Sequence, residues 1–481
     1  MVVSLLDEVR KVDLGDKRLN KRLGKIMEEL GDKPNLSIPG ATHSRAEMEA
    51  AYRFFDNAKV SPQKILQPHF DATLERISQC DFVLLVQDTT ELDLTRPHQE
   101  VQGAGPMDSG GRRGEFFHPL MAFALDGLPL GTAWQKNWAR QEAQTNLSPE
   151  EKEQQRIRTP IEEKESIRWV EGLRAAHEVA EACPETTCVC VSDSEADIYE
   201  LFSEPRSTKT GEVHLIVRAC QTRSTTEGNW LQEVRATPCL YQCSVDVSAC
   251  TAKIATTKNK RQQSRGARVA EVEVRATTVT LKAPYRFDRK LPEVTVQVVL
   301  VEETNPPKGC APIQWLLITS LPIEDSDQVK TIVQAYCVRW QIEIFFRTMK
   351  SGCRVENRQF ETLDRMMNCV ALYSIIAWRI MYLCRLGREC PDLNCEVVFE
   401  PCEWKSLYMA LKRTKPPAKP LRLNEVIRMI ASLGGYVIRK STNPGPQTLW
   451  IGLQRVHDLS TAWNAFGPEN DFFCPGKCVV R

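Results

Sequence analysis

The sequence predicts a mixed α/β domain that carries a mostly-β insertion and is flanked by helical segments. Between residues 82 and 218, short apolar runs typical of buried strands alternate with helical patterns. Short strand-like runs separated by turns fill residues 221–322. Helical patterns dominate before residue 70 and after residue 326. With about 150 residues per domain as a guide, the predicted parts are 1–70, 71–370 with its insertion at about 221–322, and 371–481.

The N-terminal part is predicted to hold two helices, over residues 16–30 and 44–57, joined by a turn near residues 34–40. The first helix is amphipathic and basic. Four of its cations recur at successive-turn spacing: Lys17, Arg18, Lys21 and Arg22. This is the size and charge of a small helical DNA-binding module, although an ordinary surface helix gives the same pattern.

The α/β part is predicted from its elements in order. An apolar strand at residues 82–86 ends at Asp88, and a hairpin turns at Asp126-Gly127. The elements that follow are a helix at 165–182, a strand at 188–191 ending at Asp193, a short helix at 195–203 and a strand at 213–218 ending at Arg218. Strands that meander first and then run parallel through helical crossovers predict a mixed sheet.

A charged helix is predicted over residues 326–350. Five of its residues fall at helical spacing on one face: Tyr336, Arg339, Glu343, Arg347 and Lys350. A second, apolar stripe consists of Val338, Ile342, Phe345 and Met349. One carboxylate among cations and a phenol is suited to a metal ion that faces a phosphate. A solvated face with ordinary charge pairing would have the same spacing.

Three carboxylates from distant segments are the candidate metal ligands. Asp88 and Asp193 each follow a buried strand at its C-terminal end, and Glu343 lies on the charged helix. Carboxylate oxygens suit Mg²⁺ and Mn²⁺. Two such ions about 4 Å apart can activate water and stabilise a leaving 3′-oxygen at phosphorus. Each aspartate alone is also explained as a turn residue or as a cap of the helix that follows.

The distribution of charges and cysteines indicates which partners and which cellular compartment this protein is expected to have. The net charge of +1 does not itself indicate a nucleic-acid partner, but basic residues concentrate in three blocks, 10–25, 258–268 and 405–422. The 18 cysteines form no regular framework and no Cys-x2-Cys pair, which favours reduced thiols in the cytoplasm over disulfides or zinc. The longest apolar stretch, residues 369–378, is too short to span a bilayer, so we expect a buried helix and no membrane partner.

These residues resemble a known family. The pattern Tyr336-x2-Arg339-x3-Glu343-x6-Lys350 resembles the Tyr-Arg-Glu-Lys signature of bacterial insertion-sequence transposases that move DNA by cut and paste. The segments around Asp88 and Asp193 resemble those that carry the family's first two catalytic aspartates. Further resemblances cover essentially the whole chain; they include Leu14–Arg18, Ala51–Phe54, Asn305–Lys308, Ile313–Thr319 and Ile430–Gly435.

The resemblance implies a ribonuclease-H-like core with Asp88, Asp193 and Glu343 as an acidic triad that binds Mg²⁺, or Mn²⁺ as a substitute, as two ions per active site. It implies end nicking, hairpin formation and resolution, and strand transfer into target DNA. Tyr336, Arg339 and Lys350 would hold a phosphate near a flipped base. Trp315 would stack on that base, and Arg347 and Arg218 would add DNA contacts.

The resemblance further implies DNA binding by residues 1–70 and dimerisation through residues 371–481. The expected partners are transposon-end DNA, target DNA and a second copy of the chain in the DNA complex. The expected place is the bacterial cytoplasm, with association to the nucleoid when DNA is bound. Two alternatives stay open: a non-catalytic DNA-binding protein or inhibitor derived from a transposase, and a metal-dependent nuclease that cuts without joining.

Overall fold

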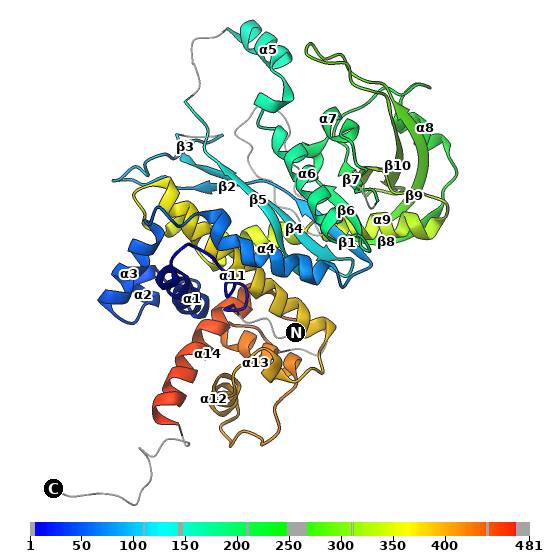
Figure 1. The fold of residues 1–481 in the computed structure, drawn as a ribbon. Coiled ribbons are helices and arrows are strands. Elements are labelled where there is room, and N and C mark those ends of the chain that lie inside the picture. Colours follow the sequence, from blue (N-terminus) through cyan, green and yellow to red (C-terminus); the bar gives the residue numbers. More distant parts are fainter. Residues whose placement is uncertain are drawn as a thin grey trace, which may run out of the picture. The chain divides into compact units, whose positions relative to one another are not determined.

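The computed structural model describes residues 5–108, 111–142, 148–207, 211–247, 267–308, 310, 312–438 and 442–467 (Figure 1). The chain divides into two compact units. The first unit contains Met1–Cys80, Thr89–Ala143 and Trp340–Arg481, and the second contains Asp81–Asp88 and Gln144–Arg339. The predicted division into 1–70, 71–370 and 371–481 stays a prediction.

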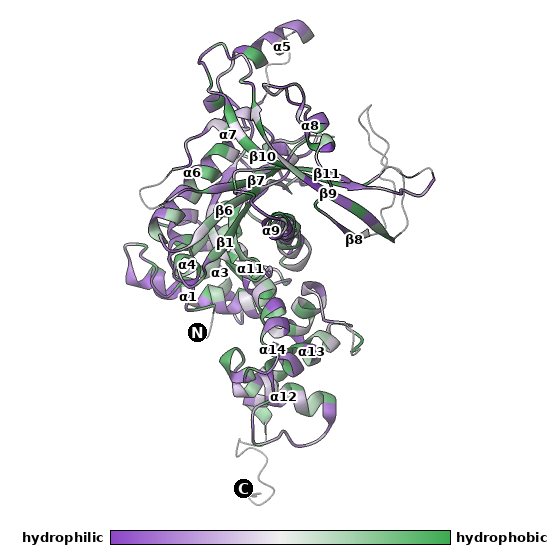
Figure 2. Cartoon of the chain, turned by 90° about the vertical axis from the view of Figure 1, so that its right-hand side faces the viewer, coloured by the Kyte–Doolittle hydropathy of each residue, from purple (hydrophilic) through white to green (hydrophobic). Residues whose placement is uncertain are grey.

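The second unit is built on a mixed sheet, which confirms the predicted α/β class. Its strands, in spatial order, are β1 (Phe82–Gln87), β6 (Thr187–Ser192), β7 (His214–Arg218), β11 (Gln314–Thr319), β10 (Val294–Glu303), β9 (Arg268–Leu281) and β8 (Tyr241–Val247). Strands β1, β6 and β7 run parallel, and each later neighbour is antiparallel. Strands β1 and β6 are hydrophobic and almost wholly buried (Figure 2), as their unbroken apolar runs predict.

Helix α6 (Ile167–Ala182) packs on β1 and β6. The contact depends on Gly172, because a Cβ at that position would overlap the amide of Gln87. The other helices of this unit are α5 (Pro149–Arg158), η1 (Ile161–Glu163), η2 (Ser194–Ala196), α7 (Tyr199–Ser203), α8 (Trp230–Ala236) and α9 (Ser326–Val338). The expected helix at 195–203 is thus two short pieces. Residues 258–266, most of the second basic block, lie outside the described residues.

The first unit combines helices with a small antiparallel sheet. Its strands are β2 (Thr90–Asp93), β3 (Gly105–Pro106), β4 (Arg113–Ala124) and β5 (Pro129–Trp138). Its α-helices are α1 (Lys17–Asp32), α2 (Ile38–Ala41), α3 (Arg45–Phe55), α4 (Pro62–Ile77), α10 (Gln341–Arg347), α11 (Leu363–Glu389), α12 (Pro401–Lys412), α13 (Leu423–Leu433) and α14 (Pro446–Phe466). Strands β4 and β5 meet at the predicted Asp126-Gly127 turn, where Gly127 adopts a positive φ of 87°.

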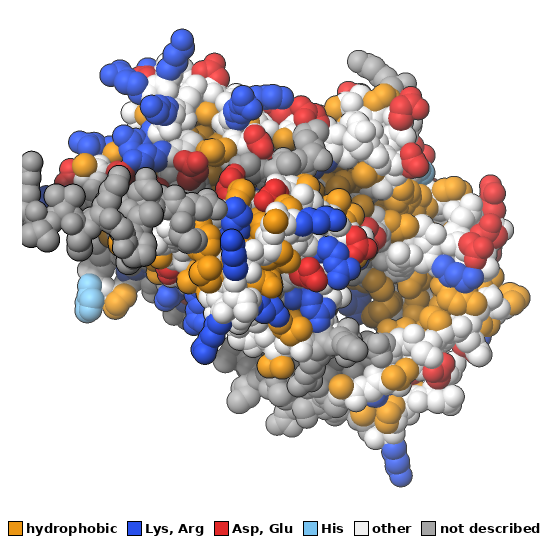
Figure 3. Space-filling view, turned by 90° about the horizontal axis from the view of Figure 1, so that it is seen from below, with side chains coloured by type: hydrophobic (Ala, Val, Ile, Leu, Met, Phe, Trp, Pro, Cys, Tyr) orange, Lys and Arg blue, Asp and Glu red, His pale blue; other side chains and the backbone are white. Residues whose placement is uncertain are grey.

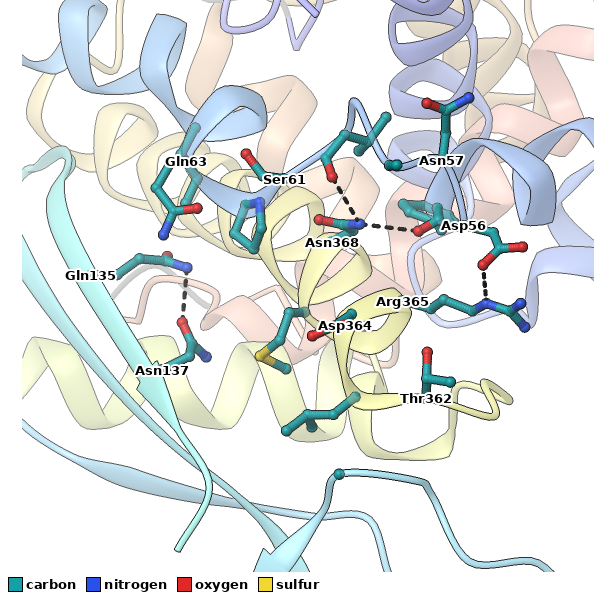
Figure 4. Close-up of a pocket in the computed structure, with 18 of the residues that line it drawn as sticks. Asp56, Asn57, Ser61, Gln63, Gln135, Asn137, Thr362, Asp364, Arg365 and Asn368 are labelled. Atoms are coloured by element: carbon teal, nitrogen blue, oxygen red, sulfur yellow. Dashed lines mark hydrogen bonds and ion pairs between the residues drawn. The ribbon is translucent and has the colours of Figure 1, made fainter.

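Helix α11 is the central helix of the first unit. By length and hydropathy alone it could cross a membrane, but 89% of its most apolar window is buried, as in the core helix of a folded domain. This agrees with the predicted buried helix. The side-chain nitrogen of Asn368 on α11 donates hydrogen bonds to the carbonyls of Phe55 and Val60, beside a pocket of about 1100 Å³ (Figure 4). These bonds tie α11 to the turn between α3 and α4.

The charged segment departs from the expectation of one helix. Helix α9 ends at Val338, α10 begins at Gln341, and Thr348–Gly352 forms the π-helical turn η3. Arg339 and Trp340, between the two helices, each have helical φ and ψ angles. The predicted apolar stripe is confirmed, because Val338, Ile342, Phe345 and Met349 are all buried.

Candidate active site

Asp88 and Asp193 occupy equivalent positions on two neighbouring strands. Strands β1 and β6 pair in parallel with Val86 opposite Val191, and each aspartate follows two residues later. Adjacent strands lie about 4.8 Å apart, so the register places both residues side by side at the C-terminal edge of the sheet. The sequence pattern predicted the edge, and the structure adds the register.

Gln87 fixes the end of β1. It is fully buried, and its side-chain nitrogen donates hydrogen bonds to the carbonyl of Trp169 on α6 and to the sulfur of Cys190 on β6, both at 3.2 Å. These contacts hold the backbone next to Asp88. The signal in the sequence was a single amide within a buried apolar strand, which needs internal partners.

The two acids that follow β6 have different roles. Asp193 accepts a hydrogen bond from the backbone N–H of Glu195 at 2.8 Å, through one carboxylate oxygen, and so caps η2. Asp197 is buried and accepts from the N–H groups of Cys220 and Gln221 at 2.8 and 2.9 Å, and from Arg223. Asp197 is therefore a structural residue. Capping and metal binding are compatible at Asp193, because the cap uses one of its two oxygens.

Arg339 and Tyr336 project from the end of α9 and are buried, which excludes a solvated charged face at these two positions. Arg339 Nη1 lies 3.2 Å from Asp88 Oδ2. Burial raises the pKa of Tyr336, while the positive charges of Arg339 and Arg218 oppose that shift and Asp193 adds to it. The phenol therefore remains protonated near neutral pH and can donate a hydrogen bond.

Trp315 lies beside Tyr336, with their ring centroids 6.3 Å apart. It is partly buried and packs against Ala270 and Ile313 rather than within the main core. Arg218 ends β7 and pairs in register with Leu317, two residues beyond Trp315. The second unit thus brings together six of the predicted site residues: Asp88, Asp193, Arg218, Trp315, Tyr336 and Arg339.

The other three predicted site residues belong to the first unit. Glu343 and Arg347 lie on α10, and Lys350 lies on η3. Arg347 donates a hydrogen bond to the side chain of Gln447 on α14 at 2.8 Å. Lys350 lies within an ionic network with Glu356, Glu91, Asp93 and Arg112, which the sequence alone did not indicate. π-helical turns are rare, and where they occur they are frequently found at functional sites.

The basic face predicted for the first N-terminal helix is present on α1. Lys17, Arg18 and Lys21 are exposed, while Leu23, Ile26, Met27 and Leu30 are buried on the opposite face. The third basic block is also largely exposed between residues 412 and 419. Lys and Arg side chains on the face drawn in Figure 3 are interspersed with acidic and hydrophobic ones.

The side chains of Asp88 and Asp193 fit a hard divalent cation, because they offer carboxylate oxygens on neighbouring strands. Among the residues that the structure describes, no three His, Cys, Asp or Glu side chains are close enough together to hold a metal ion. Each described cysteine is a free thiol.

Comparison with known proteins identifies the parts of the chain. Residues 5–60 match the family model for the transposase DNA-binding domain, and residues 375–462 match that for the Tn5 transposase dimerisation domain. Residues 150–378 match the transposase DDE domain. The chain belongs to the DDE-type insertion-sequence transposases. The predicted family and the ribonuclease-H-like mixed α/β class are thereby confirmed.

The protein is therefore a DNA transposase with a DNA-binding domain and a dimerisation domain. Transposases of this family use divalent metal ions. Asp193 and Glu343 lie within the DDE match, and Asp88 precedes it. Among solved structures, the chain is similar to a piggyBac transposase synaptic complex with hairpin DNA, at 8% identity and a TM-score of 0.35, covering 93% of this chain and 72% of that one. A score this low carries no argument about function.

Proposed function

We propose that this transposase moves DNA by cut and paste, through end nicking, hairpin formation and resolution, and strand transfer. The observation that carries the proposal is the matched register of Asp88 and Asp193, with Arg339 against Asp88. Two carboxylates at one sheet edge with a buried guanidinium beside them suit a site that must hold both cations and a phosphate.

The acidic triad of the proposal is Asp88, Asp193 and Glu343. Together they would hold Mg²⁺, or Mn²⁺ in its place, as two ions that activate the attacking oxygen and stabilise the leaving 3′-oxygen. The carboxylates of Asp88 and Asp193 orient this chemistry from rigid strand ends. The contribution of Glu343 rests on the family signature, because it lies in the first unit.

The proposed reaction is a series of displacements at phosphorus. Water attacks a phosphodiester at the transposon end, a P–O bond forms, and the bond to the 3′-oxygen breaks to release a 3′-hydroxyl. That hydroxyl attacks a phosphodiester of the opposite strand, which closes a hairpin and releases the 3′-hydroxyl of the flanking DNA. Water hydrolyses the hairpin phosphodiester and regenerates the 3′-hydroxyl. This hydroxyl attacks a target phosphodiester and displaces the 3′-oxygen of the target strand. No covalent intermediate with a protein side chain is needed.

Tyr336, Arg339 and Lys350 would bind the DNA phosphates, with Arg347 and Arg218 as further contacts. Trp315 would stack on a flipped base, since it is only partly buried and adjoins Tyr336. Stacking of about 1–3 kcal/mol per base would offset part of the cost of flipping. In the proposed dimer, each subunit binds one transposon end and cuts the other.

The test is a cleavage assay on linear DNA that carries the element's own terminal sequences, followed over time on a denaturing gel. With Mg²⁺ we expect a nick that converts to a hairpin, and we expect neither product with EDTA. The conversion depends on the released 3′-hydroxyl, so a substrate that ends in a 3′-deoxynucleotide at the nick should form no hairpin.

The same gel separates the alternatives. Binding of end DNA without cleavage in Mg²⁺ or Mn²⁺ would favour the non-catalytic DNA-binding protein. Nicks that never become hairpins or joined products, on substrates with paired ends, would favour the nuclease that cuts without joining.

A further inference from the structure

Lys350 is held in an acidic setting within the first unit. Its side chain is 29% exposed, and its Nζ lies 3.8 Å from Glu356 Oε1. The negative charges of Glu91 and Asp93 also influence Lys350, but both carboxylates form ion pairs with Arg112, at 2.7 and 3.5 Å. Glu356 is therefore the carboxylate that faces Lys350 most directly.

Glu356 is fixed by contacts that do not involve Lys350. Its Oε1 accepts a hydrogen bond from the backbone N–H of Asp93 at 3.0 Å, and its carbonyl accepts one from Arg96 at 2.6 Å. It lies in the short helix η4 (Val355–Asn357), which follows Arg354 in the left-handed region at a φ of 51°. Because these contacts hold Glu356 independently of Lys350, its carboxylate can set the position of the lysine side chain.

The same contact favours the charged form of Lys350. Burial lowers the pKa of Lys350, and among the charges around it Glu356 opposes this most strongly, followed by Glu91; Arg112 lowers the pKa further and Asp93 raises it. Removing the negative charge of Glu356 would therefore lower the pKa of Lys350 again. An ammonium that loses its proton no longer attracts a phosphate.

We propose that Glu356 is a positioning residue that aims the side chain of Lys350 at a DNA phosphate. The proposal rests on the proposed function in one respect, the role of Lys350 as a DNA contact. Glu356 itself touches neither DNA nor the reacting atoms. Its effect should appear in the pH dependence of DNA binding, which a purely structural residue would not change.

The test uses the full chain and its end DNA, with dissociation constants measured without divalent metal from pH 6.5 to pH 9.5. Glu356→Gln keeps an acceptor for the Asp93 N–H and removes only the charge. We expect the loss of binding at alkaline pH to begin at a lower pH in this variant than in the wild type. Glu361→Gln, an exposed acid that pairs with Arg365 on α11, is the matched control and should follow the wild type.

A rescue variant completes the design. Arginine stays charged across this range, so Lys350→Arg added to Glu356→Gln should remove the shift in pH dependence. An unshifted profile in Glu356→Gln, or a shift that Lys350→Arg does not remove, would overturn the proposal. Lys350→Ala reports separately on the proposed function: unchanged binding and an unchanged salt dependence in that variant would show that Lys350 is no DNA contact at all.

Discussion

Asp193→Asn should lower cleavage of transposon-end DNA by at least about a thousandfold, equivalent to about 4 kcal/mol of transition-state stabilisation. Asparagine is as good a helix cap as aspartate, so the hydrogen bond to Glu195 N–H and the fold of η2 should survive. What the variant loses is the negative charge that a divalent cation requires. Asp88→Asn should have an effect of the same size, because the two residues are equivalent in the register.

Binding of end DNA measures whether these variants remain folded. We expect dissociation constants within about threefold of the wild type, because the DNA-binding module at residues 5–60 is untouched. Asp81→Asn is the matched control: Asp81 is exposed and immediately precedes β1, at the end of the strand opposite to Asp88. Full cleavage activity in either Asp193→Asn or Asp88→Asn would contradict the assigned site.

The second large effect concerns a buried network in the first unit. Glu8 and His69 are both buried; Glu8 accepts from Arg76 at 2.8 and 3.2 Å and from Nδ1 of His69. His69 Nε2 accepts from the backbone N–H of Thr132 at 3.0 Å, so the ring is neutral with its proton on Nδ1. Glu8→Ala would remove the carboxylate that pairs with the partly buried Arg76 guanidinium and would leave the buried Nδ1–H of His69 without its acceptor. It should destabilise the protein by about 3–5 kcal/mol.

Chemical denaturation of full-length variants tests this value. Glu75→Ala removes an exposed ion pair with Lys11 in the same unit and should cost about 0–1 kcal/mol. Equal stability of Glu8→Ala and Glu75→Ala would show that the buried network contributes nothing.

The network also makes stability depend on pH. Burial lowers the pKa of His69, and although burial alone would raise the pKa of Glu8, His69 and Arg76 lower it. For both groups the pKa in the folded state lies below the value in the unfolded state. Their contribution to the free energy of unfolding is therefore present at neutral pH and is lost as the pH falls; the loss from His69 begins below about pH 6.5. Burial also lowers the pKa values of His177 and His214, so these residues contribute to the loss of stability at low pH as well. The contribution of His69 is the part of that stability loss that is absent in the His69→Gln variant.

The positions of Asp88 and Asp193, the two aspartates proposed to bind metal, were predictable from sequence because each follows a buried, mainly apolar strand. The register between them was not, since pairing depends on the packing of α6 against both strands. Gln87 shows the difference: its position in the chain is visible in the sequence, but its bonds to Trp169 and Cys190 require the packing of both α6 and β6 against β1. Helical spacing in the sequence identified Tyr336 and Arg339 as site residues. The same spacing did not predict that helix α9 ends at Val338, because the periodic pattern of residues continues past that point.

Several elements of the first unit were missed for physical reasons. Strand β4 begins at Arg113, seven residues before the apolar run that predicted it. The sequence did not reveal this earlier start because the buried polar residues Glu115 and His118 interrupt the apolar pattern. Helix α4 contains Pro68, which argues against a helix interior from sequence alone. The network around Lys350 joins residues more than 250 positions apart, such as Asp93 and Glu356, and no local pattern reports such contacts.

We propose that Asp88 and Asp193 together form a divalent-cation site, and this can be tested by measuring metal binding itself. Electron paramagnetic resonance of Mn²⁺ titrated into the full chain with bound end DNA distinguishes bound from free ion without requiring cleavage. We predict that Asp88→Asn and Asp193→Asn each weaken Mn²⁺ binding at least about tenfold, whereas Asp81→Asn binds as the wild type does. Mn²⁺ binding that is equally tight in all four proteins would contradict the claim.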